Sequence, residues 1–395
     1  MWIKATDVRG AMRLAVDATL GVTDLVEAVH LGIARTALGA APATPRADGV
    51  AGLVYRGVRG VTRIVGGGLG LAGAALEAIE GTSPESSPAR DAVLAALNGV
   101  IGDHLDASGN PLAQPMQWRV DGRVLAPDAA AITSAFGGTP RSRLFVLVHG
   151  LCLDDRSWLH GGHDHGQSLA RDFDGSAVYL RYNTGRAIGR NGAELAASIE
   201  ALLDAWPVAL DEVHVIAHSM GGLVMRSALH HAQALGLRWP RRLRSVAFLG
   251  TPHHGAPLER GGHAIDRLLQ AHPLIAPFAR IGRLRSRGIT DLRHGRLLDE
   301  DADGIATHVP LPPGIAFHAI AATVGSTGDT LADAVLGDGL VPVDSALGRG
   351  GERNLEFPAT HRHVVRGVGH MGLLGDADVH ARLAAIAALP QAPTG

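Results

Sequence analysis

Short apolar, β-rich segments that alternate with helical patterns are the feature that most constrains the fold of this chain. Five such segments follow one another, at 143–150, 176–183, 212–219, 243–252 and 315–323. Helical patterns separate several of them, for example at 193–205 and 221–235, and 378–389 reads as a last helix. Strands that alternate with helices form a mostly parallel sheet that is covered on both faces. The sequence therefore predicts an α/β fold.

The first 115 residues follow a different pattern. Residues 1–80 read as short amphipathic helical segments, and two breaks follow at 81–90 (GTSPESSPAR) and 108–115 (SGNPLAQP). We therefore expect a helical N-terminal extension with linkers over residues 1–115. The α/β domain is expected over residues 116–390.

A long interruption lies between two of the predicted strands, at about 253–314. An insertion of that size on an α/β sheet usually covers the site at the carboxyl ends of the strands. We expect it to form a helical cap or lid. The insertion contains several apolar residues, which favour an acyl substrate. These residues are Leu268, Leu269, Leu274, Ile275, Phe278 and Ile281.

The sequence AHSMGG at 217–222 stands between a strand-like and a helix-like segment. A nucleophile elbow occurs in this setting, because the tight turn raises a serine hydroxyl above the sheet and tolerates only small neighbours. The usual pattern is G-x-S-x-G, and Ala217 replaces the first glycine with another small residue. Ser219 is therefore the candidate nucleophile.

A serine nucleophile needs an acid and a histidine further along the chain. Asp338 lies in a D-G-L-V-P sequence that favours a turn at a strand end, whereas Asp344 reads as a cap for the following turn. His370 lies in a glycine-flanked loop before the last helix. Its rivals, His361 and His363, fall in a strand-like stretch where a surface role is expected.

The order of these residues supports one type of catalytic site. Ser219, then Asp338, then His370 is the chain order of the α/β-hydrolase triad. The backbone N–H groups of Leu151 and Met220 are placed to hold an oxyanion, since one follows a strand that ends in His-Gly and the other follows the serine. Such chemistry requires no metal and no organic cofactor.

On these motifs, the chain from about 116 to 390 resembles the lipase-like α/β-hydrolases. It is similar in particular to small bacterial lipases and to the group that resembles the GPI inositol-deacylases. The motifs are LVHGLC, YNTGR, IAHSMGGLV, LGTPHHGAP, GDGLVPVDSALG and GHMGLL. The resemblance implies an α/β-hydrolase fold and hydrolysis of carboxylic esters of lipids or similar acyl compounds. An acyltransferase or a thioesterase on the same fold stays open.

Composition and charge exclude some other classes of partner and site. The chain has 36 Lys and Arg against 38 Asp and Glu, which gives no electrostatic case for nucleic acid. Cys152 is the sole cysteine, so neither an internal disulfide nor a cysteine-based metal site is expected, and a packing role is favoured. The first twenty residues lack the apolar core of a signal peptide. We expect a cytoplasmic protein.

A basic amphipathic segment raises the question of membrane contact. On a helical wheel of residues 53–65, valines lie on one face and arginines on the other, at Val54, Val58, Val61, Val65 and at Arg56, Arg59, Arg63. Residues 50–80 could contact an anionic membrane peripherally. A helix packed on the hydrolase domain with a solvated basic face is the favoured alternative. A non-catalytic membrane-binding protein is the competing function, and the complete triad argues against it.

Two histidine-rich stretches also fall near the predicted site. HGGHDHG at 160–166 holds three histidines and an aspartate, but residues so close together rarely complete a tetrahedral metal site, and the sequence reveals no partner ligand. Helix capping and loop polarity are therefore favoured there over metal binding. His253 and His254, in TPHHG, either line the pocket or shape the turn into the cap.

Overall fold

The computed structural model describes residues 87–255, 286–301, 307–325, 337–350 and 353–389, with 6–20 and positions 4, 24, 56, 58–60 and 62–63 before them. The chain divides into two compact units, Met1–Arg90 with Ala107–Ala113 and Asp91–Asp106 with Gln114–Gly395. The division expected after residue 115 stays a prediction. Helix α3 (Pro88–Ala107) nevertheless contributes Ala96 and Val100 to the core of the second unit.

In the first unit, residues 6–20 and the other described positions between 24 and 63 are helical. Arg90 pairs with Asp7 at 2.5 Å between Nη2 and Oδ1. Arg59, expected on an open basic face, is buried and pairs with Asp24. Much of the segment 50–80 lies outside the described residues, so its membrane contact stays a prediction.

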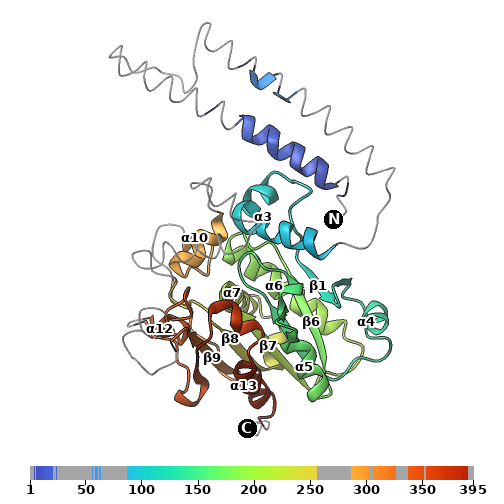
Figure 1. Cartoon of the computed structure of the whole chain (residues 1–395). Coiled ribbons are helices and arrows are strands. Elements are labelled where there is room, and N and C mark those ends of the chain that lie inside the picture. The colour runs from blue at the N-terminus through green and yellow to red at the C-terminus, as the bar shows by residue number, and fades with distance from the viewer. Residues whose placement is uncertain are drawn as a thin grey trace. The chain divides into compact units, whose positions relative to one another are not determined.

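The second unit is built on one eight-stranded sheet (Figure 1). Its strand order is β10 (Arg362–Arg366), β9 (Ala316–Thr323), β8 (Leu243–Leu249), β7 (Glu212–His218), β3 (Arg143–Val148), β6 (Ser176–Arg181), β1 (Gln117–Val120) and β2 (Arg123–Leu125). The pairs from β10 to β6 are parallel, and β1 and β2 add an antiparallel edge. The predicted mostly parallel α/β sheet is confirmed.

Alternating apolar side chains explain why both faces of the sheet are covered. Successive residues of β3 point to opposite faces, so Leu144 and Val146 join one core cluster, whereas Phe145 and Leu147 join the other. Helices α6 (Ile188–Asp204) and α7 (Met220–Ala234) cover the first face. Helices α5 (His165–Asp172) and α13 (Ala377–Ala387) cover the second (Figure 1).

Shorter elements connect this framework. They are α4 (Ala129–Ala135), η1 (Asp155–Trp158), the two-stranded sheet of β4 (Leu159–His160) and β5 (His163–Asp164), η2 (Trp239–Arg242), α10 (Arg287–His294), α12 (Val343–Ala346), η5 (Ala359–His361) and η6 (His370–Leu374). No helix in the described part of the chain combines the length and the apolarity needed to cross a bilayer.

The strand order fixes where a site forms. From β3 the chain crosses to β6 on one side and then returns to β7 on the other side of β3. In open α/β sheets, ligands bind at the carboxyl ends of the strands where the order reverses in this way. The residues that follow β3 and β7 therefore meet at the expected binding crevice.

The predicted cap at 253–314 is only partly described. Residues 256–285 and 302–306 lie outside the described residues, so the cap stays a prediction. The described part contains α10, whose N-cap Ser286 accepts a hydrogen bond from the Ile289 amide at 3.3 Å.

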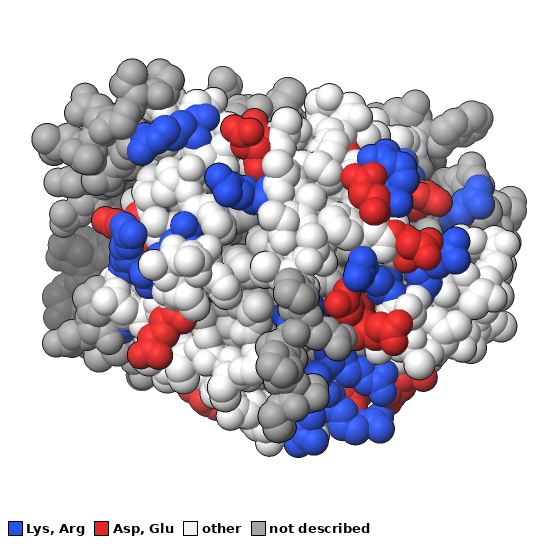
Figure 2. Space-filling view, turned by 90° about the horizontal axis from the view of Figure 1, so that it is seen from below, with Lys and Arg blue, Asp and Glu red and all other residues white. Residues whose placement is uncertain are grey.

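Acidic and basic side chains are mixed on one face of the described part of the chain. On the described part of the face drawn in Figure 2, acidic side chains lie among the basic ones. This mixture agrees with a formal net charge of −2.

Candidate active site

Ser219 occupies a strained corner between β7 and α7. Its φ of 55° and ψ of −126° are unusual for a residue that carries a side chain. The Ser219 amide donates to Leu249 O at 2.8 Å, and its carbonyl accepts from the Gly222 amide at 3.0 Å. These two bonds hold the corner in place. A strained serine between a strand and a helix is the backbone arrangement that a nucleophile elbow requires.

The glycines after the serine allow α7 to begin this close to neighbouring chain segments. A Cβ atom on Gly221 would lie 2.5 Å from the carbonyl oxygen of His149. A Cβ atom on Gly222 would lie 2.0 Å from Thr251 Oγ1. Both distances are far below van der Waals contact. The Gly-Gly pair of the motif is therefore required by packing against the residues that follow β3 and β8.

Asp338 and His370 form a buried hydrogen-bonded pair. His370 Nδ1 lies 2.7 Å from Asp338 Oδ2, and both side chains are at most 4 % exposed. Asp338 Oδ1 accepts from the amides of Leu340 and Val341 at 2.9 and 2.7 Å. These amides orient the carboxylate, which leaves Oδ2 to accept from His370. An Nδ1–H that donates to the carboxylate leaves the other nitrogen, Nε2, free to accept a proton.

The imidazole of His370 is held next to the elbow. Its ring centroid lies 4.7 Å from that of His218, the residue that precedes Ser219. His218 Nε2 lies 3.2 Å from His370 O, and the His370 amide donates to Asp338 O at 3.0 Å. Among the described residues, no hydrogen bond joins Ser219 to the imidazole. Catalytic hydrogen bonds of this kind often tighten only when substrate is bound.

Two amides near Ser219 are available to an oxyanion. Met220 is the first residue of α7, so its N–H has no acceptor within the helix. Leu151 follows Gly150, whose Cβ, if present, would lie 2.9 Å from Ser219 Cβ. Gly150 O accepts from the Leu153 amide at 3.3 Å, which closes a turn through Leu151. No acceptor for the Leu151 amide occurs within the described ranges.

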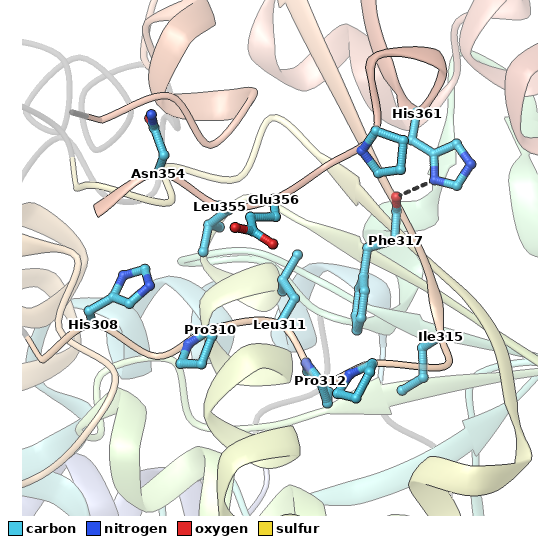
Figure 3. A pocket seen from close by; sticks show the side chains of 12 residues that line it. His308, Pro310, Leu311, Pro312, Ile315, Phe317, Asn354, Leu355, Glu356 and His361 are labelled. Carbon is cyan, nitrogen blue, oxygen red and sulfur yellow. Dashed lines mark hydrogen bonds between the residues drawn. The ribbon is translucent and has the colours of Figure 1, made fainter. Parts of the chain in front are cut away.

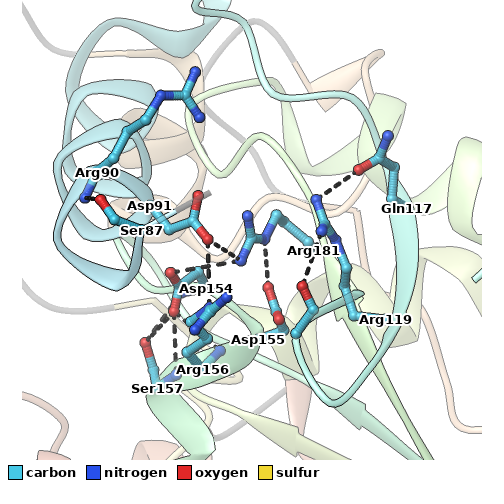
Figure 4. A network of polar contacts seen from close by, with 11 residues as sticks. Ser87, Arg90, Asp91, Gln117, Arg119, Asp154, Asp155, Arg156, Ser157 and Arg181 are labelled. Carbon is cyan, nitrogen blue, oxygen red and sulfur yellow. Dashed lines mark hydrogen bonds and ion pairs between the residues drawn. The ribbon is translucent and has the colours of Figure 1, made fainter. Parts of the chain in front are cut away.

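A buried network of charges supports this turn (Figure 4). Arg181 at the end of β6 pairs with Asp155 and, at 3.0 Å, with Asp91 of α3. Asp154 caps η1 and accepts from the Ser157 amide at 3.1 Å. Burial lowers the pKa of Arg181, but Asp155 and Asp91 outweigh it, so the pKa is raised overall. The chain after Leu151 is thus anchored to β6 and α3.

The rival residues lie elsewhere. Asp344 is exposed and pairs with Arg349 at 3.3 Å. His361 Nδ1 lies 2.9 Å from Phe317 O, and the His363 ring stacks at 6.4 Å from that of His318. His361 lines a cavity of about 450 Å³ between residues 308–317 and 354–361 (Figure 3). Neither Ser219, Asp338 nor His370 lines that cavity, so it is separate from the candidate site.

Buried neighbours of the site have packing roles. Burial raises the pKa of the Cys152 thiol to about 12, which makes it an unreactive side chain, as the sequence favours. His253 is buried with its ring edge on Phe248 at 4.9 Å. Burial lowers its pKa well below the usual range, so the imidazole is neutral.

Two supporting residues were missed from the sequence. His218 lies within the elbow motif, and its ring and Nε2 contact His370. Arg181 is the last residue of β6, a strand buried along its whole length, and a charge in such a strand signals buried partners. That signal identifies a network but not the residues, Asp91 and Asp155, that complete it.

The α/β unit is similar to known proteins. Residues 172–318 match a family model described as a PGAP1-like alpha/beta domain. The mature form of Bacillus licheniformis lipase BlEst2 is 20% identical over 69% of this chain and 99% of that chain, with a TM-score of 0.42. The RedJ thioesterase from the prodiginine biosynthetic pathway in Streptomyces coelicolor is 18% identical over 62% and 84%, with a TM-score of 0.37. No curated protein sequence matches significantly.

Proposed function

Because the second unit has the sheet of a lipase-like α/β-hydrolase and carries a PGAP1-like domain, we propose that it hydrolyses carboxylic esters through an acyl-enzyme on Ser219. One observation carries this proposal. The 2.7 Å pair of Asp338 and His370 is held against the residue that precedes a strained serine, where the strand order reverses.

In the first half of the reaction, Ser219 Oγ attacks the ester carbonyl carbon while His370 Nε2 takes the hydroxyl proton. The C–O bond of the tetrahedral intermediate then breaks, and His370 returns the proton to the departing alcohol. In the second half, His370 takes a proton from water as the water oxygen attacks the acyl carbon. The bond between that carbon and Ser219 Oγ then breaks, and His370 returns the proton to Ser219 Oγ as the acid leaves. Asp338 holds the tautomer and stabilises the imidazolium in both halves.

The oxyanion is assigned to the amides of Leu151 and Met220. A donor of this kind contributes about 3 kcal/mol to the transition state of acyl transfer. The Met220 amide also lies at the N-terminus of the fifteen-residue helix α7, whose dipole favours negative charge. Both donors are backbone groups, so they are best tested through the side chains that position them.

Labelling and substitution test the nucleophile. A fluorophosphonate probe should modify Ser219, and Ser219→Ala should lower kcat by about 10⁶-fold. Ser134→Ala, an exposed serine of α4, is the matched control and should keep full activity. Modification of another residue, or near-normal turnover of Ser219→Ala, would exclude the proposed mechanism.

Lipid or similar acyl esters are the substrate class we propose. Support comes from the resemblance and from apolar residues of the 253–314 insertion, of which 268–281 lie outside the described residues. Chromogenic esters of increasing acyl length test it, and a preference for acetate over every longer chain would reject the lipase assignment. Product analysis with added alcohols and with thioesters separates hydrolysis from acyl transfer and thioester cleavage.

We also propose, separately, a peripheral membrane contact through residues 50–80, based on the amphipathic pattern of residues 53–65. Its exposed cations are Arg56 and Arg63, since Arg59 is buried against Asp24. Sedimentation of the full chain with anionic and with zwitterionic vesicles tests it. Equal binding to both, or to neither, would contradict an electrostatic contact.

A further inference from the structure

Three histidines gather on the face of the sheet that α5 and α13 cover. His163 lies on β5, His165 is the first residue of α5, and His380 lies on α13. One ring nitrogen from each lies within 4.8 Å of the others. Within the described ranges, no other group of three His, Cys, Asp or Glu side chains is close enough to hold a metal ion. The three residues are called the histidine cluster below.

The local backbone fixes two of these residues. β4 and β5 form a hairpin in which His160 pairs with His163, and the two glycines between them have φ of 59° and 82°. Two positive φ values in a two-residue loop are typical of a type I′ turn. Asp164 then caps α5 by accepting from the Gln167 amide at 2.9 Å. The capping role favoured from the sequence therefore belongs to Asp164, and the histidines are not needed for it.

The hydrogen bonds of the cluster fix the tautomer of His165 and bring its lone pair to the centre. His165 Nε2 lies 3.0 Å from Leu373 O, and a carbonyl only accepts, so Nε2 is the donor and Nδ1 carries the lone pair. That Nδ1 accepts from His163 Nε2 at 2.9 Å, so His163 has to shift this hydrogen to its other ring nitrogen when a metal binds. His380 Nε2 lies 3.6 Å from an Asp172 carboxylate oxygen, and its Nδ1 is buried without a hydrogen-bond partner among the described residues. Metal-binding histidines characteristically place their second nitrogen on a carbonyl or carboxylate in this way.

We propose that the histidine cluster binds a divalent transition-metal ion, with Zn²⁺ as its best match. Three neutral imidazoles suit zinc, copper and nickel, and exclude magnesium and calcium, which require oxygen ligands. Three protein ligands leave a fourth tetrahedral position for water. Zn–N bonds of about 2.0–2.1 Å place ligand nitrogens about 3.4 Å apart, so the rings close by small rotations. His163 and His380 are only partly buried, which leaves an entry path.

The metal would link segments that support the candidate active site. Leu373, whose carbonyl bonds to His165, belongs to η6, the segment that begins at His370. Binding would join β5, α5 and α13 around that contact. Its role is structural, and it goes beyond the proposed ester hydrolysis, whose chemistry uses no metal.

Zinc titration of the full chain tests the site. Protein stripped of metal by a chelator and dialysed should bind one equivalent of ZnCl₂ by calorimetry and by elemental analysis. His380→Gln and His163→Gln should each weaken binding at least tenfold. His294→Gln is the matched control, because His294 Nδ1 bonds to Thr290 O of its own helix, and it should bind like the wild type.

A measurement on the wild-type chain guards against variants that fail to fold. Zinc should protect His163 and His380 from diethyl pyrocarbonate, as mapped by mass spectrometry, and should raise Tm by several degrees. The proposal is overturned if the wild type binds no stoichiometric zinc. It is also overturned if both cluster variants bind as tightly as the control, because the zinc then sits elsewhere, for example on Asp338 and His370.

Discussion

Replacement of Arg181 by Met should destabilise the α/β unit strongly while barely changing the volume of the side chain. Arg181 is 4 % exposed, and its guanidinium is shared by the carboxylates of Asp91 and Asp155, which are 1 % and 5 % exposed. Methionine fills the space but removes the cation that pairs with Asp155, and it takes from Asp91 one of its cations, the other being Arg156 at 3.4 Å. Removal of one partner from a buried ion pair costs about 3–5 kcal/mol. Because the free energy of unfolding of a domain is only about 5–15 kcal/mol, this loss is a large fraction of its total stability.

Urea and thermal unfolding measure the loss. For a domain of this size, about 3–5 kcal/mol corresponds to a fall in Tm of about 6–20 °C. Arg141→Met is the matched control, since Arg141 pairs with Asp174 at 3.0 Å with side chains 59 % and 80 % exposed. An exposed pair of this kind contributes less than about 1 kcal/mol.

The dependence on pH separates the charge argument from simple loss of packing. Without Arg181, the two buried carboxylates keep a negative charge that has lost this cation, and protonation at mildly acidic pH removes that charge. The difference in stability between variant and wild type should therefore shrink as the pH falls from 7 to 5. The charge argument is refuted if Arg181→Met loses no more free energy of unfolding than Arg141→Met. It is also refuted if the loss caused by Arg181→Met does not change with pH.

Three further predictions concern the elbow, the triad and acid stability. Gly222→Ala should lower the free energy of unfolding by about 1–3 kcal/mol, because its Cβ would lie 2.0 Å from Thr251 Oγ1. Adding Thr251→Gly should restore part of this loss. If the two losses are simply additive in a double-mutant cycle, the clash is contradicted. Asp338→Asn should lower kcat about 10⁴-fold through the wrong histidine tautomer, with its CD spectrum unchanged. Burial lowers the pKa of His149 to about 4 in the folded state. As the pH falls from about 6.5 to about 4, this imidazole is therefore protonated in the unfolded chain but not in the folded one. Stability should fall in that window by up to about 3 kcal/mol from this group, and urea titrations should show a smaller fall for His149→Phe.

The parts of the fold that follow local patterns were predictable from the sequence. The five predicted strands are all present, because an apolar, β-branched run between turns has few other stable conformations. The strand–turn–helix order around Ser219 was predictable for the same reason, since a strand, a small-residue corner and a helix follow one another within residues 212–235. The antiparallel edge strands β1 and β2 were not predicted, because they are short and partly exposed.

Contacts between distant segments were not predictable. HGGHDHG by itself indicates a loop without a further metal ligand, whereas His380 of the last helix completes the histidine cluster. Likewise, Asp91 precedes the expected domain boundary, yet its carboxylate meets Arg181 of β6. Hydrophobic periodicity shows which face of α13 or α3 is buried, but not which polar side chains come together when it packs.

The short helix η6 takes its position from three sources. The backbone carbonyl of Asp338 accepts a hydrogen bond from the His370 amide. His218 Nε2 lies within hydrogen-bond distance of the His370 carbonyl oxygen, and His165 Nε2 donates to the Leu373 carbonyl oxygen. Transplanting residues 370–374 alone into a related scaffold would therefore displace the imidazole, because the residues that fix its position lie in other segments of the chain. A redesign that moves His370 therefore has to move those three supporting residues with it.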